Sequence, residues 1–232
     1  MSTQPIFTRY LYDSKQVTNS LAWAIIEKKR EEVLFWAYEL YHSGFQTEVW
    51  YWVRDFYVNY YEEYNPLFKY HLDRFYLQWK ETGDPCLIGT VVGTLSMRDR
   101  REDEKNFILL YKEDRHQMKP ILDKPRNYLM HVSQYPIRFE NVFAEDDDPE
   151  CQKLELKRIR DAYLGPNWLY YCSETPVWLN RILEFGGRVA EDKKEILFET
   201  DEGLEAFYDR WGFEPDEQSA EMHKTHGICI ET

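Results

Sequence analysis

The sequence predicts a mainly α-helical fold: antiparallel helical hairpins packed as a bundle or a short α-solenoid, with a small C-terminal β-hairpin plus a helix. Apolar residues recur at three- and four-residue spacing through residues 1–97, which is typical of amphipathic helices. The intervening loops are only a few residues long, so consecutive helices should be antiparallel neighbours. Short β-prone runs take over only after residue 187.

The first two helices are predicted from their apolar faces and their ends. Asp13 or Ser14 can cap the first helix by accepting a backbone N–H bond. Gly44 suits the left-handed stop after the second helix. The residues expected on the buried faces are Val17, Leu21, Ala24 and Ile25 in the first helix, and Val33, Trp36, Ala37, Leu40 and Tyr41 in the second.

The third helix, from about Thr47 to Tyr64, is unusually rich in aromatic residues. Its polar residues Glu48, Asp55, Asn59 and Glu62 fall on one narrow stripe, so most of its surface should be covered by neighbouring helices. We therefore interpret it as the core of a bundle, against the alternatives of a protein-docking surface or a platform for base stacking. Any exposed, partner-binding patch is expected at its tyrosine-rich end, at Tyr57, Tyr60, Tyr61 and Tyr64.

Two more helices complete the expected N-terminal body. Pro66 can occupy the first turn of a fourth helix that Gly83 ends. A fifth helix is predicted within residues 84–100, where Gly89 and Gly93 would permit close helix packing.

The sequence predicts an aromatic-rich helical domain at residues 1–97 and three further segments after it. Residues 98–148 form an irregular, proline-containing connector. Residues 149–215 hold helices and a β-hairpin, with Thr175 as the cap of one helix, and should pack on the first domain. Residues 216–232 form an acidic tail.

Composition and charge exclude several classes of protein. A hydrophobic content of 43% is enough to build a core, and the net charge of −13 repels nucleic-acid phosphates, so nucleic-acid binding is not expected. The four cysteines are far apart, which indicates reduced thiols and an intracellular site of action. No run of eighteen apolar residues exists, so no membrane span is predicted.

The sequence carries no recognisable catalytic or cofactor motif. It lacks the serine-hydrolase turn, the phosphate-binding P-loop, the dinucleotide glycine motif and the H-E-x-x-H zinc motif, so we expect no cofactor and no catalytic metal. His223, His226 and Cys229 could hold zinc, but a fourth ligand is not evident, and an unstructured polar tail is the favoured interpretation.

A second group of candidate partner-binding residues combines arginine with aromatic rings. This group consists of Arg158, Arg160, Trp168, Tyr170 and Tyr171. Such a combination can line a groove for a protein or read RNA, and it can equally be a packed turn between two helices.

Two segments give the chain a resemblance to a known family. "EEVLFWAYELYHSGF" at 31–45 and "FETDEGLEAFYDRWGFEPDEQ" at 198–218 resemble segments of uncharacterised proteins from giant nucleocytoplasmic large DNA viruses, the mimivirus and algal-virus relatives. "YDSKQVTNSLAWAIIEKK" also fits the opening helix of that family. The resemblance implies a viral origin and a location in the virion or the cytoplasm of the infected host cell. It lends no catalytic residues.

Together these observations predict a non-enzymatic viral protein that works through contacts with other proteins, which are expected to be viral. The leading hypothesis is a minor capsid protein or another virion component. A helical adaptor in viral transcription or translation is the alternative, and an enzyme with an unrecognised site is a third possibility. The sequence does not identify the partner or the oligomeric state.

Overall fold

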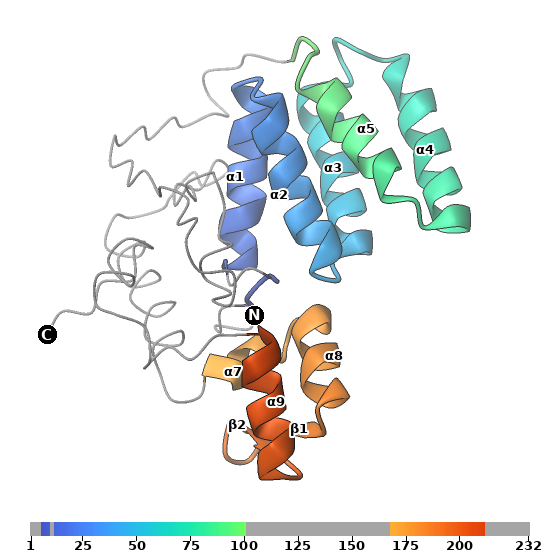
Figure 1. Ribbon diagram of the computed structural model, residues 1–232. Coiled ribbons are helices and arrows are strands. Elements are labelled where there is room, and N and C mark those ends of the chain that lie inside the picture. The colour runs from blue at the N-terminus through green and yellow to red at the C-terminus, as the bar shows by residue number, and fades with distance from the viewer. Residues whose placement is uncertain (1–5, 10–11, 101–167, 212–232) are drawn as a thin grey trace, which may run out of the picture. The chain divides into compact units, whose positions relative to one another are not determined.

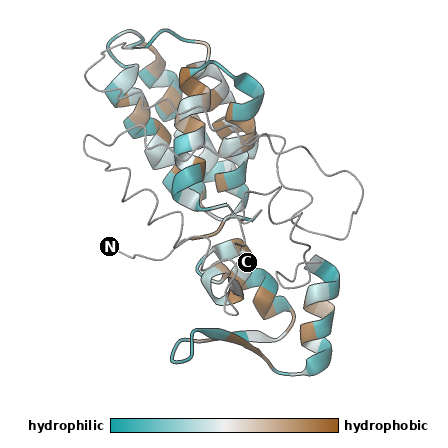
Figure 2. Cartoon of the chain, turned by 90° about the vertical axis from the view of Figure 1, so that its left-hand side faces the viewer, coloured by the Kyte–Doolittle hydropathy of each residue, from teal (hydrophilic) through white to brown (hydrophobic). Residues whose placement is uncertain are grey.

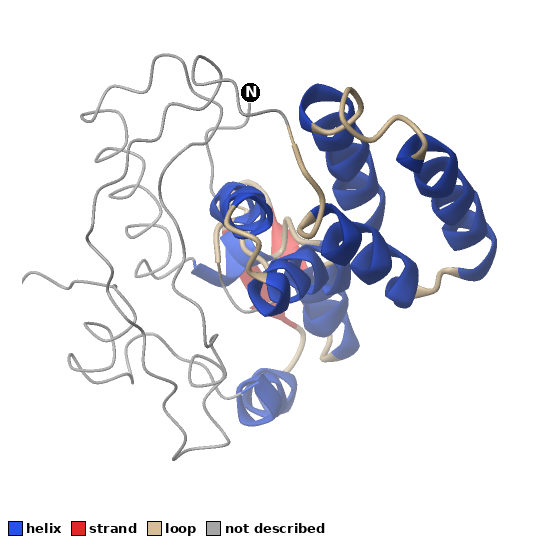
Figure 3. Cartoon of the chain, turned by 90° about the horizontal axis from the view of Figure 1, so that it is seen from above, coloured by secondary structure: helices blue, strands red, loops and turns tan. Residues whose placement is uncertain are grey.

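A computed structural model describes residues 6–9, 12–100 and 168–211, which divide into two compact units (Figure 1). The helical unit comprises the described residues from Lys15 to Arg100. The terminal unit comprises residues 6–9, 12–14 and 168–211. The described residues form eight helices and one two-stranded antiparallel sheet (Figure 3), so the prediction of a mainly helical fold with a small C-terminal hairpin and helix is confirmed.

The helical unit contains five helices that lie side by side (Figure 1). Their bounds are α1 Ser14–Ile26, α2 Arg30–His42, α3 Gln46–Tyr60, α4 Phe68–Thr82 and α5 Pro85–Leu95. Every apolar residue predicted for the buried faces of the first two helices is buried. Hydrophobic and hydrophilic residues are interleaved along these helices (Figure 2), as the 3.6-residue period requires.

Helix α5, which is rich in small residues, packs against α2, α3 and α4. Asp84 caps it by accepting the backbone N–H of Cys86 at 2.8 Å, and Pro85 occupies the first helical position. Gly89 faces Tyr38 so closely that a Cβ atom there would overlap the tyrosine ring. Gly89 thus permits a close contact between α5 and α2, as predicted, whereas a Cβ atom on Gly93 would have room.

Helix α3 ends at Tyr60, four residues before the predicted end at Tyr64. The backbone N–H groups of Tyr61 and Glu62 both donate to the carbonyl of Tyr57, at 2.8 and 2.9 Å, which ends the regular ladder. The chain then turns back, and the Tyr57 hydroxyl donates to the carbonyl of Asn65 at 2.8 Å. The turn is therefore fixed by a side chain of the helix that precedes it, a contact that the helical period does not reveal.

The terminal unit is built around a short hairpin and two longer helices. Its elements are α7 Trp168–Cys172, α8 Pro176–Glu184, β1 Gly187–Ala190, β2 Glu195–Phe198 and α9 Asp201–Trp211. The strands pair antiparallel from Gly187 opposite Phe198 to Ala190 opposite Glu195. Phe207 of α9 is fully buried, and its ring lies 5.4 Å from that of Phe198 and 5.9 Å from that of Phe185.

Residues near the N-terminus belong to this terminal unit, whereas the sequence placed them in the domain at residues 1–97. The Thr175 hydroxyl donates to the carbonyl of Phe7, and the Trp178 indole N–H donates to the carbonyl of Thr8 at 2.9 Å. Thr175 does occupy the N-cap position of α8, as predicted, but its side chain makes no capping bond. Its hydroxyl instead anchors the N-terminal segment at Phe7.

The predicted connector beyond residue 100, the first part of the segment predicted at residues 149–215 and the acidic tail lie outside the described residues. Within the ranges that the structure does describe, every helix is too short or too polar to cross a lipid bilayer.

The first prediction concerns the buried aromatic face of α3. Phe56 is 2% exposed, whereas Trp52, stacked on it at 4.9 Å, is only half-buried. Phe56→Ala should lower the free energy of unfolding by about 3–5 kcal/mol and Trp52→Ala by about 1–3 kcal/mol. Urea unfolding followed by circular dichroism measures both, and equal losses would contradict this assignment of the core.

The second prediction compares two helical glycines. A Cβ atom on Gly203 would lie 2.6 Å from the backbone oxygen of Phe185, whereas the nearest atom to one on Gly93 is Arg30 Nε at 3.8 Å. Both changes to alanine gain about 1 kcal/mol of helix propensity. We expect Gly93→Ala to raise the melting temperature and Gly203→Ala to lower it, because backbone at Phe185 cannot swing aside. Thermal unfolding measures the melting temperatures of the two variants. A Gly203→Ala protein that melts above the wild type would contradict the close approach of Gly203 to Phe185.

Candidate functional site

Large hydrophobic side chains are exposed mainly on and between α3 and α4. Among the described residues nine large hydrophobic side chains are exposed, and six of them fall between residues 51 and 77. We call these six the α3–α4 surface: Tyr51, Val58, Tyr64, Leu67, Tyr70 and Leu77. Concentrated exposed apolar area on a folded protein marks an interaction site more often than scattered residues do.

A groove with a volume of about 150 Å³ lies between α3 and α4, and two residues of this surface, Tyr51 and Val58, line it. Buried Tyr57 and Leu72 line it together with exposed Tyr51 and Val58. The charged residues that complete the lining are Arg54, Asp55, Lys69 and Asp73. The groove is therefore a small amphipathic hollow, apolar at its buried residues and charged at its edges.

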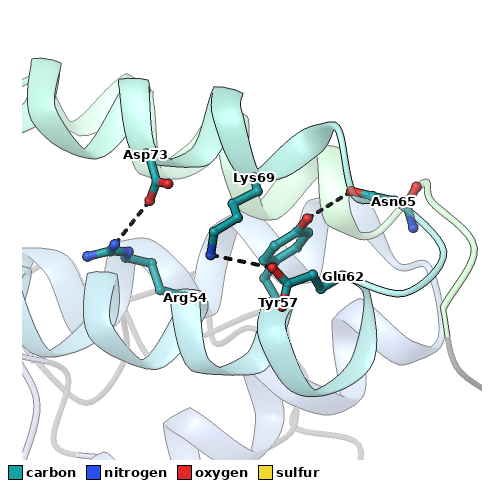
Figure 4. Close-up of polar contacts among 6 residues, drawn as sticks. All are labelled: Arg54, Tyr57, Glu62, Asn65, Lys69 and Asp73. Atoms are coloured by element: carbon teal, nitrogen blue, oxygen red, sulfur yellow. Dashed lines mark hydrogen bonds and ion pairs between the residues drawn. The ribbon is translucent and has the colours of Figure 1, made fainter.

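One ion pair joins α3 to α4 at the groove, and a second joins α4 to the turn that follows α3 (Figure 4). Arg54 Nη2 lies 3.0 Å from Asp73 Oδ1, and the same guanidinium lies over the ring of Tyr76, 4.7 Å from its centroid. Lys69 Nζ lies 3.4 Å from Glu62 Oε1. All four charged groups of these pairs are more than a third exposed, so the pairs contribute little to stability.

The turn between α3 and α4 is held by hydrogen bonds centred on Asn65 (Figure 4). Its carbonyl accepts the Tyr57 hydroxyl, and burial raises the pKa of that hydroxyl. Its side-chain amide donates to the carbonyl of Asp99 at 2.6 Å and to that of Tyr61 at 3.3 Å. Arg98 Nη1 donates to its side-chain oxygen at 3.2 Å. These bonds fix the end of the groove to the segment that follows α5.

One charge in the groove is not compensated. Arg54 is paired with Asp73 and Lys69 with Glu62, but the exposed side chain of Asp55 makes no ion pair or hydrogen bond with any described residue. The groove therefore carries one free carboxylate beside the aromatic ring of Tyr51. This arrangement favours a cationic side chain, whose stem can lie on apolar atoms while its head meets the carboxylate.

The size of the groove limits what it can hold. Pockets for drug-sized molecules measure roughly 300–1,000 Å³. A volume of about 150 Å³ instead corresponds to one amino-acid side chain or to roughly five water molecules of 30 Å³ each. The groove fits a single side chain of another protein better than a substrate or cofactor.

The four tyrosines predicted as a partner-binding patch fall into two groups. Tyr57 and Tyr61 are 0% and 1% exposed, so both belong to the core, although Tyr57 also lines the buried side of the groove. Tyr60 is half-buried, and only Tyr64 is well exposed, at 56%. Their spacing could not separate them, because burial of this end depends on how the chain turns back after Tyr60. Partner binding by Tyr60 and Tyr64 stays a prediction.

The second predicted group is described only in part. Arg158 and Arg160 lie outside the described residues, as does the side chain of Trp168. Tyr170 is buried, and its hydroxyl donates to Glu191 Oε2 at 2.7 Å, which raises its pKa to about 12. Tyr171 is half-buried against it. Buried Tyr170 is thus a packing residue of the terminal unit, in line with the packed-turn alternative.

Groups with altered acidity or metal-binding chemistry do not converge on the groove. Glu174, whose pKa is raised by burial and by the charge of Glu191, belongs to the terminal unit. Within the described ranges, no group of three or more histidine, cysteine or carboxylate side chains could hold a metal ion. His223, His226 and Cys229 lie outside those ranges.

The sequence did not single out the residues that shape the groove. The helical wheel did place Asp55 on the solvent stripe of α3, and Glu48, Asp55 and Asn59 are indeed exposed. Tyr51 and Val58 lie four residues before and three residues after Asp55, so helical spacing places them beside that stripe, but their apolar character suggested burial. One signal in the sequence could have indicated an exposed surface on α4. Leu67, Tyr70, Arg74 and Leu77 recur there at three- and four-residue spacing.

Tyr61 gives a prediction for alkaline stability. Burial raises the pKa of Tyr61 to about 12, so the folded state retains a proton that the unfolded chain loses near pH 10. The contribution of Tyr61 to the free energy of unfolding is fully present below pH 10. About 2–3 kcal/mol of it is lost as the pH rises through 12. Tyr61→Phe should flatten this decline in unfolding experiments between pH 9 and 12. Tyr64→Phe, the matched loss of an exposed hydroxyl, should keep the wild-type slope, and an unchanged slope in both variants would contradict the assignment.

Comparison of the chain with protein-family models, with curated proteins and with solved structures found no match.

Proposed function

We propose that this chain is a non-enzymatic protein-interaction component that binds another protein through the groove between α3 and α4. The observation that carries the proposal is a groove the size of one side chain, lined by exposed Tyr51 and Val58 and by the free carboxylate of Asp55. Aromatic and aliphatic side chains around a small pocket are the usual anchor points of protein interfaces.

The partner in this proposal inserts a lysine or arginine side chain. Its methylene groups would lie against Val58 and the buried Leu72, and its charged head would lie between Asp55 and the ring of Tyr51. Asp55 is available for this contact, whereas the other charges of the groove already have partners. A basic partner also agrees with the net charge of −13, which would steer a positively charged protein toward the chain.

The resemblance to proteins of giant DNA viruses supports placing this interaction in a virion, where the chain would be a minor capsid protein or another structural component. In that setting a −13 protein can bridge basic neighbours without chemistry of its own. Mass spectrometry of purified virions tests this placement. Detection at a constant ratio to the major capsid protein is the expected result, and absence from washed virions would refute it.

Charge reversal at Asp55 tests the groove itself. Asp55→Lys places a cation where the partner's cation should bind, so affinity for the co-purified partner should fall at least about tenfold, which corresponds to about 1.4 kcal/mol. Glu48→Lys is the matched control, because it makes the same charge change at an exposed site on the same helix. Isothermal titration calorimetry with each purified variant measures the affinities. Equal losses in both would show that only net charge matters and would refute binding in the groove.

A further inference from the structure

The outward face of α4 carries a second set of exposed side chains, separate from the groove. Leu67, Tyr70 and Leu77 are 86%, 68% and 60% exposed, and Arg74 is exposed between them. They lie opposite Leu72, which is 2% exposed and faces the core. We call these four residues the α4 stripe: Leu67, Tyr70, Arg74 and Leu77.

The spacing of the α4 stripe is that of a helix-pairing seam. Steps of three, four and three residues repeat the a and d positions of a heptad over about 15 Å of helix. Leu67 precedes the first helical residue but has helical backbone angles, so it continues the same face. Helix α4 also lies at the edge of the helical unit (Figure 1), which leaves this face accessible.

Two copies of the α4 stripe can pair with each other in antiparallel orientation. Its spacing is palindromic, so a second α4 laid antiparallel across it matches Leu67 with Leu77 and Tyr70 with Arg74, each pair occurring twice. Leucine pairs bury apolar area, and an arginine over a tyrosine ring makes a cation–π contact. A two-fold interface requires this reciprocity, in which residue i meets j and j meets i.

Arg74 supports this arrangement. It makes no ion pair with any described residue, and its only ring contact is with Phe75 of its own helix, 5.5 Å from the centroid. Neighbouring Asp73 is already paired with Arg54. Arg74 is thus a charged residue within an apolar stripe whose guanidinium remains available.

We propose that α4 is a homodimer interface in which two copies of the chain pair antiparallel along Leu67, Tyr70, Arg74 and Leu77. The interface does not depend on the groove or its partner. Its seam is short and each chain carries a charge of −13, so the dimer is weak at low salt and strengthens as salt screens the repulsion.

Sedimentation equilibrium of the full chain from about 1 μM to about 1 mM tests the dimer. Wild type should show a monomer–dimer equilibrium in this range, and Leu67→Glu and Arg74→Glu should each weaken it at least about tenfold. Leu183→Glu is the matched control, because Leu183 is 54% exposed in the terminal unit and should leave the equilibrium unchanged. A wild-type protein that is monomeric throughout, or a dimer insensitive to both α4 changes, would overturn the proposal.

Cysteine pairing tests the register. In a background with Cys86, Cys151 and Cys229 changed to serine, mixed Leu67→Cys and Leu77→Cys proteins should form a disulfide-linked heterodimer on mild oxidation, whereas each alone should not. Self-linking of either single variant would overturn the antiparallel register. Asp55→Lys should leave the dimer intact and Arg74→Glu should leave groove affinity intact, so failure of one proposal is distinguishable from failure of the other.

Discussion

Packing of aromatic rings between α3 and α4 is the constraint on which the rest of the helical unit depends. The ring of fully buried Trp50 lies 5.7 Å from that of Tyr76 and 5.6 Å from that of Trp79, and Tyr57 lies against Phe68 at 5.8 Å. These rings fill the space between the two helices. Arg54 of α3 lies over the ring of Tyr76 and pairs with Asp73 of α4, and both charged residues line the groove.

Much of the fold could be predicted because its causes are local. Apolar periodicity placed the buried faces of α1 and α2, and Gly83 ends α4 with a φ of 67°, in the left-handed region that favours glycine. The early end of α3 and the anchoring of the N-terminal residues by Thr175 could not be predicted. Both depend on hydrogen bonds between residues that no periodic pattern relates, in the second case across most of the chain.

The candidate site was harder to predict than the fold. The sequence gives no reason to distinguish Tyr61 from Tyr64, yet Tyr61 is in the core and Tyr64 is exposed. The difference arises from the turn after Tyr60, which carries one ring inward and leaves the other outside. Tyr51 and Val58 are exposed on the same side of α3 as the polar stripe. The stripe indicates which side of α3 faces solvent, but it does not show how far the exposed side extends to neighbouring apolar residues.

The position of Asn65 has a consequence for the chemical ageing of the protein. Asparagine normally deamidates when the backbone nitrogen of the next residue attacks its side chain, but Pro66 follows Asn65 and its nitrogen carries no hydrogen. Deamidation would replace the amide that donates to Asp99 and Tyr61 with a carboxylate that cannot donate. The Asn-Pro order closes that route, so the turn that positions the groove keeps its hydrogen bonds as the protein ages.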